Sequence, residues 1–212
     1  MPRPLPLLAA LFAVGSLTTG CALGERPTLS AAEVVTDPAA QTVLERLDRR
    51  PAVDFTAEYT ITPTSTGAAT SSTVTRSAGV TTTRIGDVTY TTDAGGSTST
   101  CRADGTPCTD GADDALVSNL GVTHQFWNDS TRQRLATDSA RRIGTSTGST
   151  ATIAGQAAVC VAIKLPSSVE AVGTVGYCAL DHGVVGRYVG ADTVIELTAF
   201  EVAAAATEPA SD

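Results

Sequence analysis

The chain has 212 residues, with 14 basic and 22 acidic side chains and a formal net charge of −8. This length predicts one domain that is large enough to bury a hydrophobic core. The acidic balance argues against nucleic-acid binding, which needs a basic stripe or patch. Threonine is abundant and the strongest helix formers are scarce, so the composition favours β structure. The five cysteines are an odd number, and one of them therefore needs a role other than an intramolecular disulfide.

The N-terminal residues are organised like a secretory signal. Arg3 gives a weakly positive start, and residues 5–17 form a mainly apolar run of about 13 residues, the usual length of a signal-peptide core. A helix that crosses a membrane needs about 20 residues, so this run is too short to span one. We therefore expect residues 1–20 to be a signal peptide.

The segment Leu17-Thr18-Thr19-Gly20-Cys21 resembles the lipobox of bacterial lipoproteins, because small residues directly precede a cysteine. The resemblance implies cleavage between Gly20 and Cys21 and transfer of diacylglycerol to the Cys21 sulfur. Thr18 departs from the pattern, which prefers leucine at that position. The alternatives are an ordinary secreted protein with a leftover thiol and an uncleaved anchor.

A diacylated Cys21 would hold the protein durably on the outer face of the cell membrane, because two acyl chains bind far more firmly than one. Residues 21–29 then form a short tether before the domain. Loss of residues 1–20 would remove Arg3 and no other charged residue, which changes the net charge from −8 to −9. An acidic body is repelled by an anionic leaflet, so the lipid must supply the attachment.

The other four cysteines are expected to form two disulfides, because export leads to an oxidising compartment. Four cysteines allow three pairings. Their spacing favours Cys101–Cys108 and Cys160–Cys178. A structural zinc site is the rival interpretation, but the sequence has no C-x-x-C spacing.

Two of these positions also fit a strand register. An antiparallel hairpin centred on residue 169 would place Cys160 opposite Cys178 and Val161 opposite Tyr177. Facing residues at a non-hydrogen-bonded site lie close enough for a disulfide.

The elements follow in the order helix, meander, helices, meander. Asp37-Pro38 is a good helix start, and this helix should run to about Arg50 with Val43, Leu44 and Leu47 as its apolar stripe. Residues 53–62 alternate between apolar and polar, which predicts a strand with one wet face. Further short strands are expected at residues 70–76, 80–85, 88–92, 97–101, 151–153, 157–165, 174–180, 184–189 and 194–202. Helices are expected at residues 110–120 and 124–142, and a frayed tail at residues 203–212.

This order predicts an α+β fold with helices on one face of an antiparallel sheet. The opening helix followed by Val53-Asp-Phe-Thr-Ala-Glu-Tyr59 resembles LolA-like proteins. Residues 152–160 and 176–187 resemble the second half of actinobacterial lipoproteins of the LppX and LprG type. The resemblance covers most of residues 30–202. It implies a curved half-barrel sheet covered by helices, with space between them for acyl chains.

The same resemblance offers no short catalytic signature and no cofactor motif. It implies a non-enzymatic extracytoplasmic lipoprotein that binds or carries a lipid or another amphiphile. Residues 70–100 contain few large apolar side chains, whereas ligand pockets are mostly apolar. The alternative is a cell-surface protein-interaction or sensory module without a ligand cavity, which acts on a partner membrane protein.

Several motifs have ordinary structural explanations. Residues 144–148 match G-x-S-x-G, but a nucleophile elbow needs a strand before it and a helix after it, so a loop is expected here. Trp127 and its neighbour Phe126 are expected to pack in the core. Four aspartates near the first disulfide fit solvated turns and a helix start better than a calcium loop; they are Asp104, Asp110, Asp113 and Asp114.

The two histidines have no assigned role. His182 follows Asp181 in a hairpin turn, and Gly183 can adopt a positive φ there. His124 lies near a helix start. Adjacent residues in a turn do not form the oriented acid–base pair of a catalytic triad, so a Ser–His–Asp site is poorly supported.

Overall fold

The computed structural model describes residues 35–49, 53–166 and 173–203. The expected signal peptide at residues 1–20, the cleavage and lipidation site at Gly20 and Cys21, and the tether at residues 21–29 lie outside this range. So does the expected tail beyond residue 203. Within the described residues, no helix has the length and apolar character that crossing a membrane requires.

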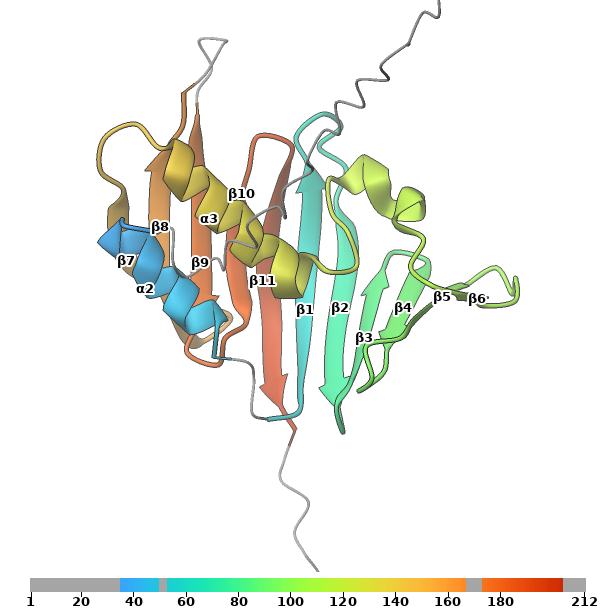
Figure 1. Ribbon diagram of the computed structural model, residues 1–212. Helices are drawn as coiled ribbons and strands as arrows, with labels where there is room; N and C mark the ends of the chain where they lie inside the picture. Colours follow the sequence, from blue (N-terminus) through green and yellow to red (C-terminus); the bar gives the residue numbers. More distant parts are fainter. Residues whose placement is uncertain (1–34, 50–52, 167–172, 204–212) are drawn as a thin grey trace, which may run out of the picture.

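One antiparallel sheet of 11 strands dominates the described residues (Figure 1). Its order is β6-β5-β4-β3-β2-β1-β11-β10-β9-β8-β7, so the first and last strands are neighbours at the centre. The first-half strands are β1 (Phe55–Pro63), β2 (Thr70–Ser77), β3 (Val80–Ile85), β4 (Val88–Thr92), β5 (Thr98–Arg102) and β6 (Thr109–Asp110). The second-half strands are β7 (Thr147–Ile153), β8 (Gln156–Lys164), β9 (Thr174–Leu180), β10 (Val185–Val189) and β11 (Thr193–Val202).

The helices lie on one face of this curved, unclosed sheet (Figure 1). They are α2 (Pro38–Leu47), the 3-10 helix η1 (Asp114–Leu120), the π-helical turn η2 (Phe126–Ser130) and α3 (Thr131–Arg141). Helix α2 packs on β8 and β9, and α3 packs beside α2. The predicted fold class is therefore confirmed: an α+β fold with a curved antiparallel sheet and helices on one face.

The space beneath these helices is filled by side chains. Asp37 caps α2 by accepting the Ala40 amide hydrogen at 3.0 Å, and Pro38 occupies the first turn. The apolar stripe of α2 is buried, and the fully buried Leu135 of α3 meets the same core. Across from them lie the inward-facing residues of the sheet, including Val161, Ile163, Tyr177, Ala179 and Ile195.

Both predicted disulfides are present. Cys101 and Cys108 have Cα atoms 4.3 Å apart, and those of Cys160 and Cys178 are 4.0 Å apart. The predicted hairpin register is also confirmed, since Cys160 lies opposite Cys178 and Val161 opposite Tyr177 in the β8–β9 pair.

Some predicted boundaries are wrong. Helix α2 ends at Leu47, not near Arg50. The Asp48 amide still makes the i→i−4 bond to Leu44, but the Arg49 amide bonds to Arg46, three residues back, which tightens the last turn. The predicted helix at 110–120 begins only at Asp114 and is a 3-10 helix. Its first residue, Asp110, instead belongs to β6, because the disulfide at Cys108 returns the chain alongside β5.

The region after residue 122 differs from the prediction in two ways. The single helix expected at 124–142 is a π-helical turn followed by α3. The loop expected at 144–148 becomes a strand from Thr147 onward, paired with β8. Every residue of β7 except Ile153 is exposed, so hydrophobic alternation could not mark it as a strand.

Candidate functional site

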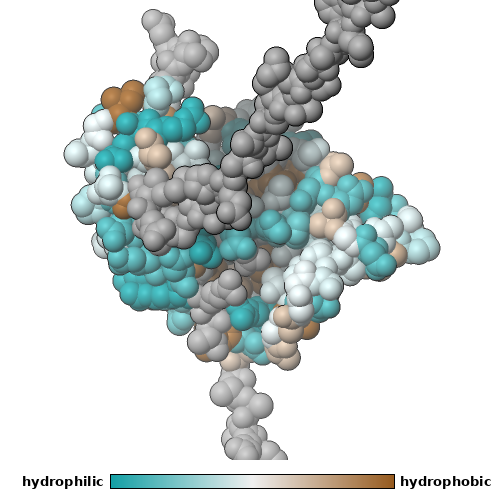
Figure 2. All heavy atoms as spheres, in the orientation of Figure 1, coloured by the Kyte–Doolittle hydropathy of each residue, from teal (hydrophilic) through white to brown (hydrophobic). Residues whose placement is uncertain are grey.

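The uncovered half of the sheet carries a groove with a volume of about 510 Å³. Its floor is the helix-side face of β1–β5, and its wall is formed by η2, the start of α3 and the turn before β10. Figure 2 shows this side of the molecule, where hydrophilic residues cover most of the surface and hydrophobic ones show in the central recess and in patches at the margin. The lining includes Phe55, Tyr59, Val74, Arg76, Thr81, Thr92, Asp93, Thr98, His124, Trp127, Asp129, Arg132 and Val184.

Strand register explains why the floor changes character along its length. Phe55 lies opposite Arg76, Arg76 opposite Thr81, Thr81 opposite Thr92, and Thr92 opposite Thr98. These five residues therefore form one row across five strands, with neighbours about 4.8 Å apart. The row runs from an aromatic ring through a guanidinium to three hydroxyl groups.

Aromatic side chains gather at the β1 end of the groove. The ring of Tyr59 lies 5.4 Å from that of Trp127, and the rings of Phe55 and Phe200 are 5.7 Å apart. Burial raises the pKa of Tyr59 well above its usual value. Trp127 is only 7% exposed, and its indole nitrogen has no hydrogen-bond partner among the described residues. The prediction that Phe126 and Trp127 pack in the core holds, and Trp127 lines the groove as well.

The charged side chains in the lining differ in whether they have an ion-pair or hydrogen-bond partner. Arg132 contacts Asp48 at 2.8 Å and Asp129 at 3.1 Å. Asp93 accepts the Ser97 amide hydrogen at 2.9 Å. Arg76, by contrast, has no carboxylate within 4.0 Å among the described residues. As far as the described residues go, Arg76 is therefore a cation of the groove without an ion-pair partner, although the chain has a net charge of −8.

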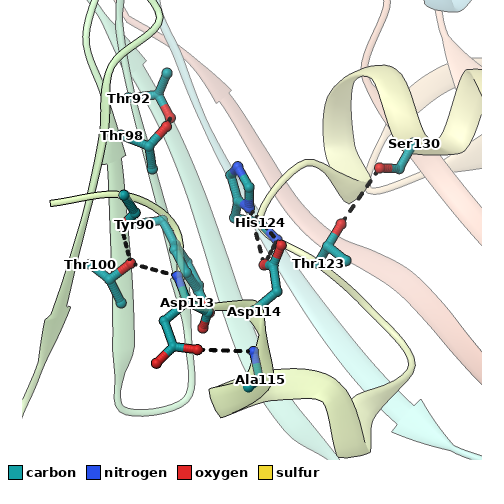
Figure 3. A network of polar contacts seen from close by, with 11 residues as sticks. Tyr90, Thr92, Thr98, Thr100, Asp113, Asp114, Ala115, Thr123, His124 and Ser130 are labelled. Atoms are coloured by element: carbon teal, nitrogen blue, oxygen red, sulfur yellow. Dashed lines mark hydrogen bonds and ion pairs between the residues drawn. The ribbon is translucent and has the colours of Figure 1, made fainter. Parts of the chain in front are cut away.

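His124 is fixed at the rim by Asp114 (Figure 3). The His124 amide donates to Asp114 at 2.7 Å, and Nδ1 of its ring lies 3.0 Å from both carboxylate oxygens. The ring also stacks on Tyr90 at 5.4 Å. Tyr90 donates to the Asp113 carbonyl at 2.9 Å. Burial, followed by the charges of Asp114 and Asp113, raises the pKa of Tyr90 to about 12.

This network ties the segment before η2 to the sheet. Thr100 accepts the Asp113 amide hydrogen at 3.1 Å and donates to Gly111 at 2.7 Å. Thr92 and Thr98 share a hydrogen bond of 2.9 Å on the neighbouring part of the floor (Figure 3). The rim and the floor of the groove are thus held together by hydrogen bonds.

The other candidate residues do not form a catalytic group with His124. Ser146 of the G-x-S-x-G motif lies between α3 and β7, where its amide donates to Asp37. The motif therefore follows a helix and precedes a strand, the reverse of a nucleophile elbow. His182 stacks on Phe200 at 5.5 Å, and Asp181 forms an ion pair with Arg46.

The remaining aspartates of the predicted turns have local partners. Asp104 accepts hydrogen bonds from the hydroxyl and the amide of Thr106. These two bonds, together with the charge of Arg102, lower the pKa of Asp104. Asp113 caps η1 through the Ala115 amide. These contacts agree with the expected turn and helix-start roles.

Sequence reasoning did not find the groove. The sequence pattern gives no signal for Arg76, Arg132 or the row of threonines, because threonine alternation is typical of any exposed strand. The one pattern that pointed to them was the shortage of large apolar residues over 70–100, which leaves this half of the sheet open.

No protein-family model matches this sequence, and the search of curated proteins gives no match. Among solved structures, the chain is similar to MucB, with 16% identity, a TM-score of 0.43, and coverage of 80% of this chain and 60% of MucB. The complex of Pseudomonas aeruginosa MucA and MucB gives 12% identity, a TM-score of 0.44, and coverage of 80% and 59%. PNGF-II gives 10% identity, a TM-score of 0.39, and coverage of 73% and 28%. The chain spans less than two thirds of the length of these MucB chains.

Proposed function

We propose that this protein is a non-enzymatic, extracytoplasmic binding protein, held on the outer face of the cell membrane by a lipid on Cys21. Its groove takes an amphiphilic ligand. The observation that carries the proposal is the graded floor of the groove, which runs from Phe55 through Arg76 to the hydroxyl of Thr98.

Two features support the extracytoplasmic location. The domain contains two disulfides, which persist in oxidising compartments and are rare in the cytosol. The sequence before Cys21 resembles a lipobox, and the lipid would supply attachment that the acidic domain itself does not favour.

The groove suits a ligand with two unlike ends. Its volume of about 510 Å³ lies within the range of ligand sites in proteins. The exposed parts of Phe55 and Trp127, each 7% exposed, form the apolar end of the lining for a hydrocarbon part, while Thr81 and Thr98 offer hydroxyl groups to a polar part. The core beneath α2 and α3 is filled, so we place the ligand in the open groove and not under the helices.

Trp127 makes this proposal testable, because it is the only tryptophan in the chain. Lauric acid or dodecyl maltoside, each added below its micelle concentration, should change the Trp127 fluorescence saturably. Thr81→Phe fills the floor and should weaken this response. Thr82→Phe is the matched control, since Thr82 is the next residue and points to the opposite face of β3. No response with either probe would contradict ligand binding.

Anchoring has a separate test. Cys21→Ala should move the protein from the membrane fraction to the medium, because it removes the acylated sulfur. Protein that stays in the membrane fraction after this change would contradict the lipid anchor and leave the groove proposal standing.

One observation favours a second candidate function, a protein-interaction module. The groove is open and partly polar, which also suits an extended peptide of a partner membrane protein. Native mass spectrometry of the protein purified from its own host separates the two candidates. A bound species that organic solvent extracts supports the amphiphile, whereas a bound polypeptide supports the interaction module.

A further inference from the structure

The two edges of the sheet are built differently. The β6 edge has only two residues, carries Asp110, and follows directly on the disulfide at Cys108. Short length and charge are the usual means by which a sheet edge avoids pairing with another strand. The β7 edge, Thr147–Ile153, has seven residues with no charge and no proline. Among the described residues, one edge is therefore protected and the other pairs with no further strand.

The geometry of the turn after β7 shows which backbone amide and carbonyl groups of β7 are free to pair with another strand. Ile153 pairs with Gln156 across a two-residue turn, in which Ala154 and Gly155 have φ values of 47° and 74°. Residues that flank such a turn exchange both backbone hydrogen bonds. Alternate residues of β7 therefore direct their amide and carbonyl groups away from β8. These outward-directed residues are Gly148, Thr150 and Thr152.

We propose that a second copy of this chain pairs with β7 through its own β7, antiparallel and about a twofold axis at Thr150. This register places Gly148 opposite Thr152 of the other copy and Thr150 opposite its counterpart. In this register the backbone groups of all three outward-directed residues are hydrogen-bonded to the other copy, whereas a register shifted in either direction leaves some of them unpaired. Facing threonines are favourable cross-strand neighbours, and no like charges oppose each other.

Charge explains why this edge suits a second copy. The chain carries a net charge of −8, so two copies repel each other over most of their surfaces. Strand β7 has no charged residue, and the nearby Asp181 and Arg46 form an ion pair. The β7 edge is thus a place where two acidic copies can meet without local repulsion. An identical pair about a twofold axis is also the commonest form of protein assembly.

The position of the N-terminal residues adds a second argument, which rests on the proposed anchor at Cys21. Asp37 accepts the amide hydrogen of Ser146, the residue directly before β7, at 3.2 Å. A Cβ atom added at Gly148 of β7 would lie 3.3 Å from the Cβ of Ala39, so the start of α2 lies close to this strand. The described chain begins only two residues before Asp37, at Val35. The β7 edge therefore lies beside the first described residues, from which the chain leads back to Cys21.

Cysteine cross-linking in membranes of cells that express the full chain tests this pairing. Facing residues of paired strands have Cα atoms about 5.5 Å apart, within the range that a disulfide bridges. Thr150→Cys should give a covalent dimer on a non-reducing gel after mild oxidation. The parent chain and Ser71→Cys are the controls, since Ser71 is an exposed residue of the interior strand β2. Both should remain monomeric.

A second variant separates pairing from chance collision. Thr152→Lys, added to Thr150→Cys, places a charge on the edge and should abolish the covalent dimer. Monomer from Thr150→Cys in anchored, folded protein would overturn the proposal, and so would equal dimer from Ser71→Cys. The anchor is scored independently by fractionation of the Cys21→Ala chain, so the two proposals can fail separately.

Discussion

Ile61 of β1 and Ile195 of β11 face each other at the centre of the sheet, and both side chains are completely buried. They join the first strand of the chain to the last. Strands β2–β6 follow outward from β1, and strands β10–β7 follow outward from β11. The two halves of the sheet therefore meet along this one strand pair.

Shortening Ile195 should destabilise the whole sheet. Ile195→Ala removes buried methyl groups and leaves a cavity at this strand pair, so the free energy of unfolding should fall by about 2–5 kcal/mol. Urea unfolding, followed by Trp127 fluorescence and by circular dichroism, measures the change. Thr198→Ala, an exposed site in the same strand, should change stability by less than about 0.5 kcal/mol. A loss of less than about 1 kcal/mol for Ile195→Ala would contradict this role.

Asp37 should make stability depend on pH in the acidic range. Burial alone would raise the pKa of Asp37, but the amides of Ala40 and Ser146 and the guanidinium of Arg142 outweigh it, so its pKa is lowered. A group whose pKa is lowered by folding stabilises the protein above its unfolded pKa, about 3.9. That contribution is lost as the pH falls through the lowered, folded value.

Asp37→Asn should therefore reduce stability at pH 7 and flatten its dependence on pH below about 5. Thermal unfolding between pH 7 and pH 2 measures both effects. Glu58→Gln is the matched control, because it removes one exposed carboxylate from the outward face of β1. If the stability of Asp37→Asn fell with pH as steeply as that of the parent chain, another carboxylate would be responsible for the pH dependence.

The sequence predicts the strands best where one face is wet and the other buried. Residues 80–85, 88–92 and 174–180 match β3, β4 and β9 at both ends. Only the last three residues of β7, 151–153, were predicted as strand, because β7 buries almost nothing and its Thr147 and Gly148 resemble a loop. The register of Cys160 and Cys178 was predictable because a disulfide restricts which residues can face each other.

The groove was not predictable for a different reason. It depends on where η2 and α3 lie against the sheet, and that placement results from packing between residues distant in sequence. Tyr59 and Trp127, for instance, lie 68 residues apart in the sequence (127 − 59). Arg76 gains its significance only because β1–β5 align it with Phe55 and Thr81 in one row.

The two disulfides should contribute similarly to stability. Their sequence separations are 7 and 18 residues, for which the loop-entropy model gives about 2.5 and 3 kcal/mol. The Cys160→Ala/Cys178→Ala double variant should lose slightly more than the Cys101→Ala/Cys108→Ala variant in urea unfolding. Equal unfolding of parent and variants under reducing conditions is the control. A much larger loss at Cys101 would indicate that its loop supports β6 and η1 by more than chain entropy.

Arg76 should select the head group of the proposed amphiphile. It is the cation of the groove without a carboxylate nearby among the described residues, and it lies between Phe55 and Thr81 on the floor. Because a hydrogen bond to a charged group is worth about 1.5–3 kcal/mol, Arg76→Gln should weaken lauric acid binding by about 10-fold or more. Binding of uncharged dodecyl maltoside should stay the same. Arg84→Gln removes the same charge from the exposed, opposite face of β3 and should leave both affinities unchanged. Trp127 fluorescence titration measures the affinity of both variants for both probes. Equal weakening of lauric acid and dodecyl maltoside binding by Arg76→Gln would show that Arg76 shapes the groove but does not recognise the charge of the head group.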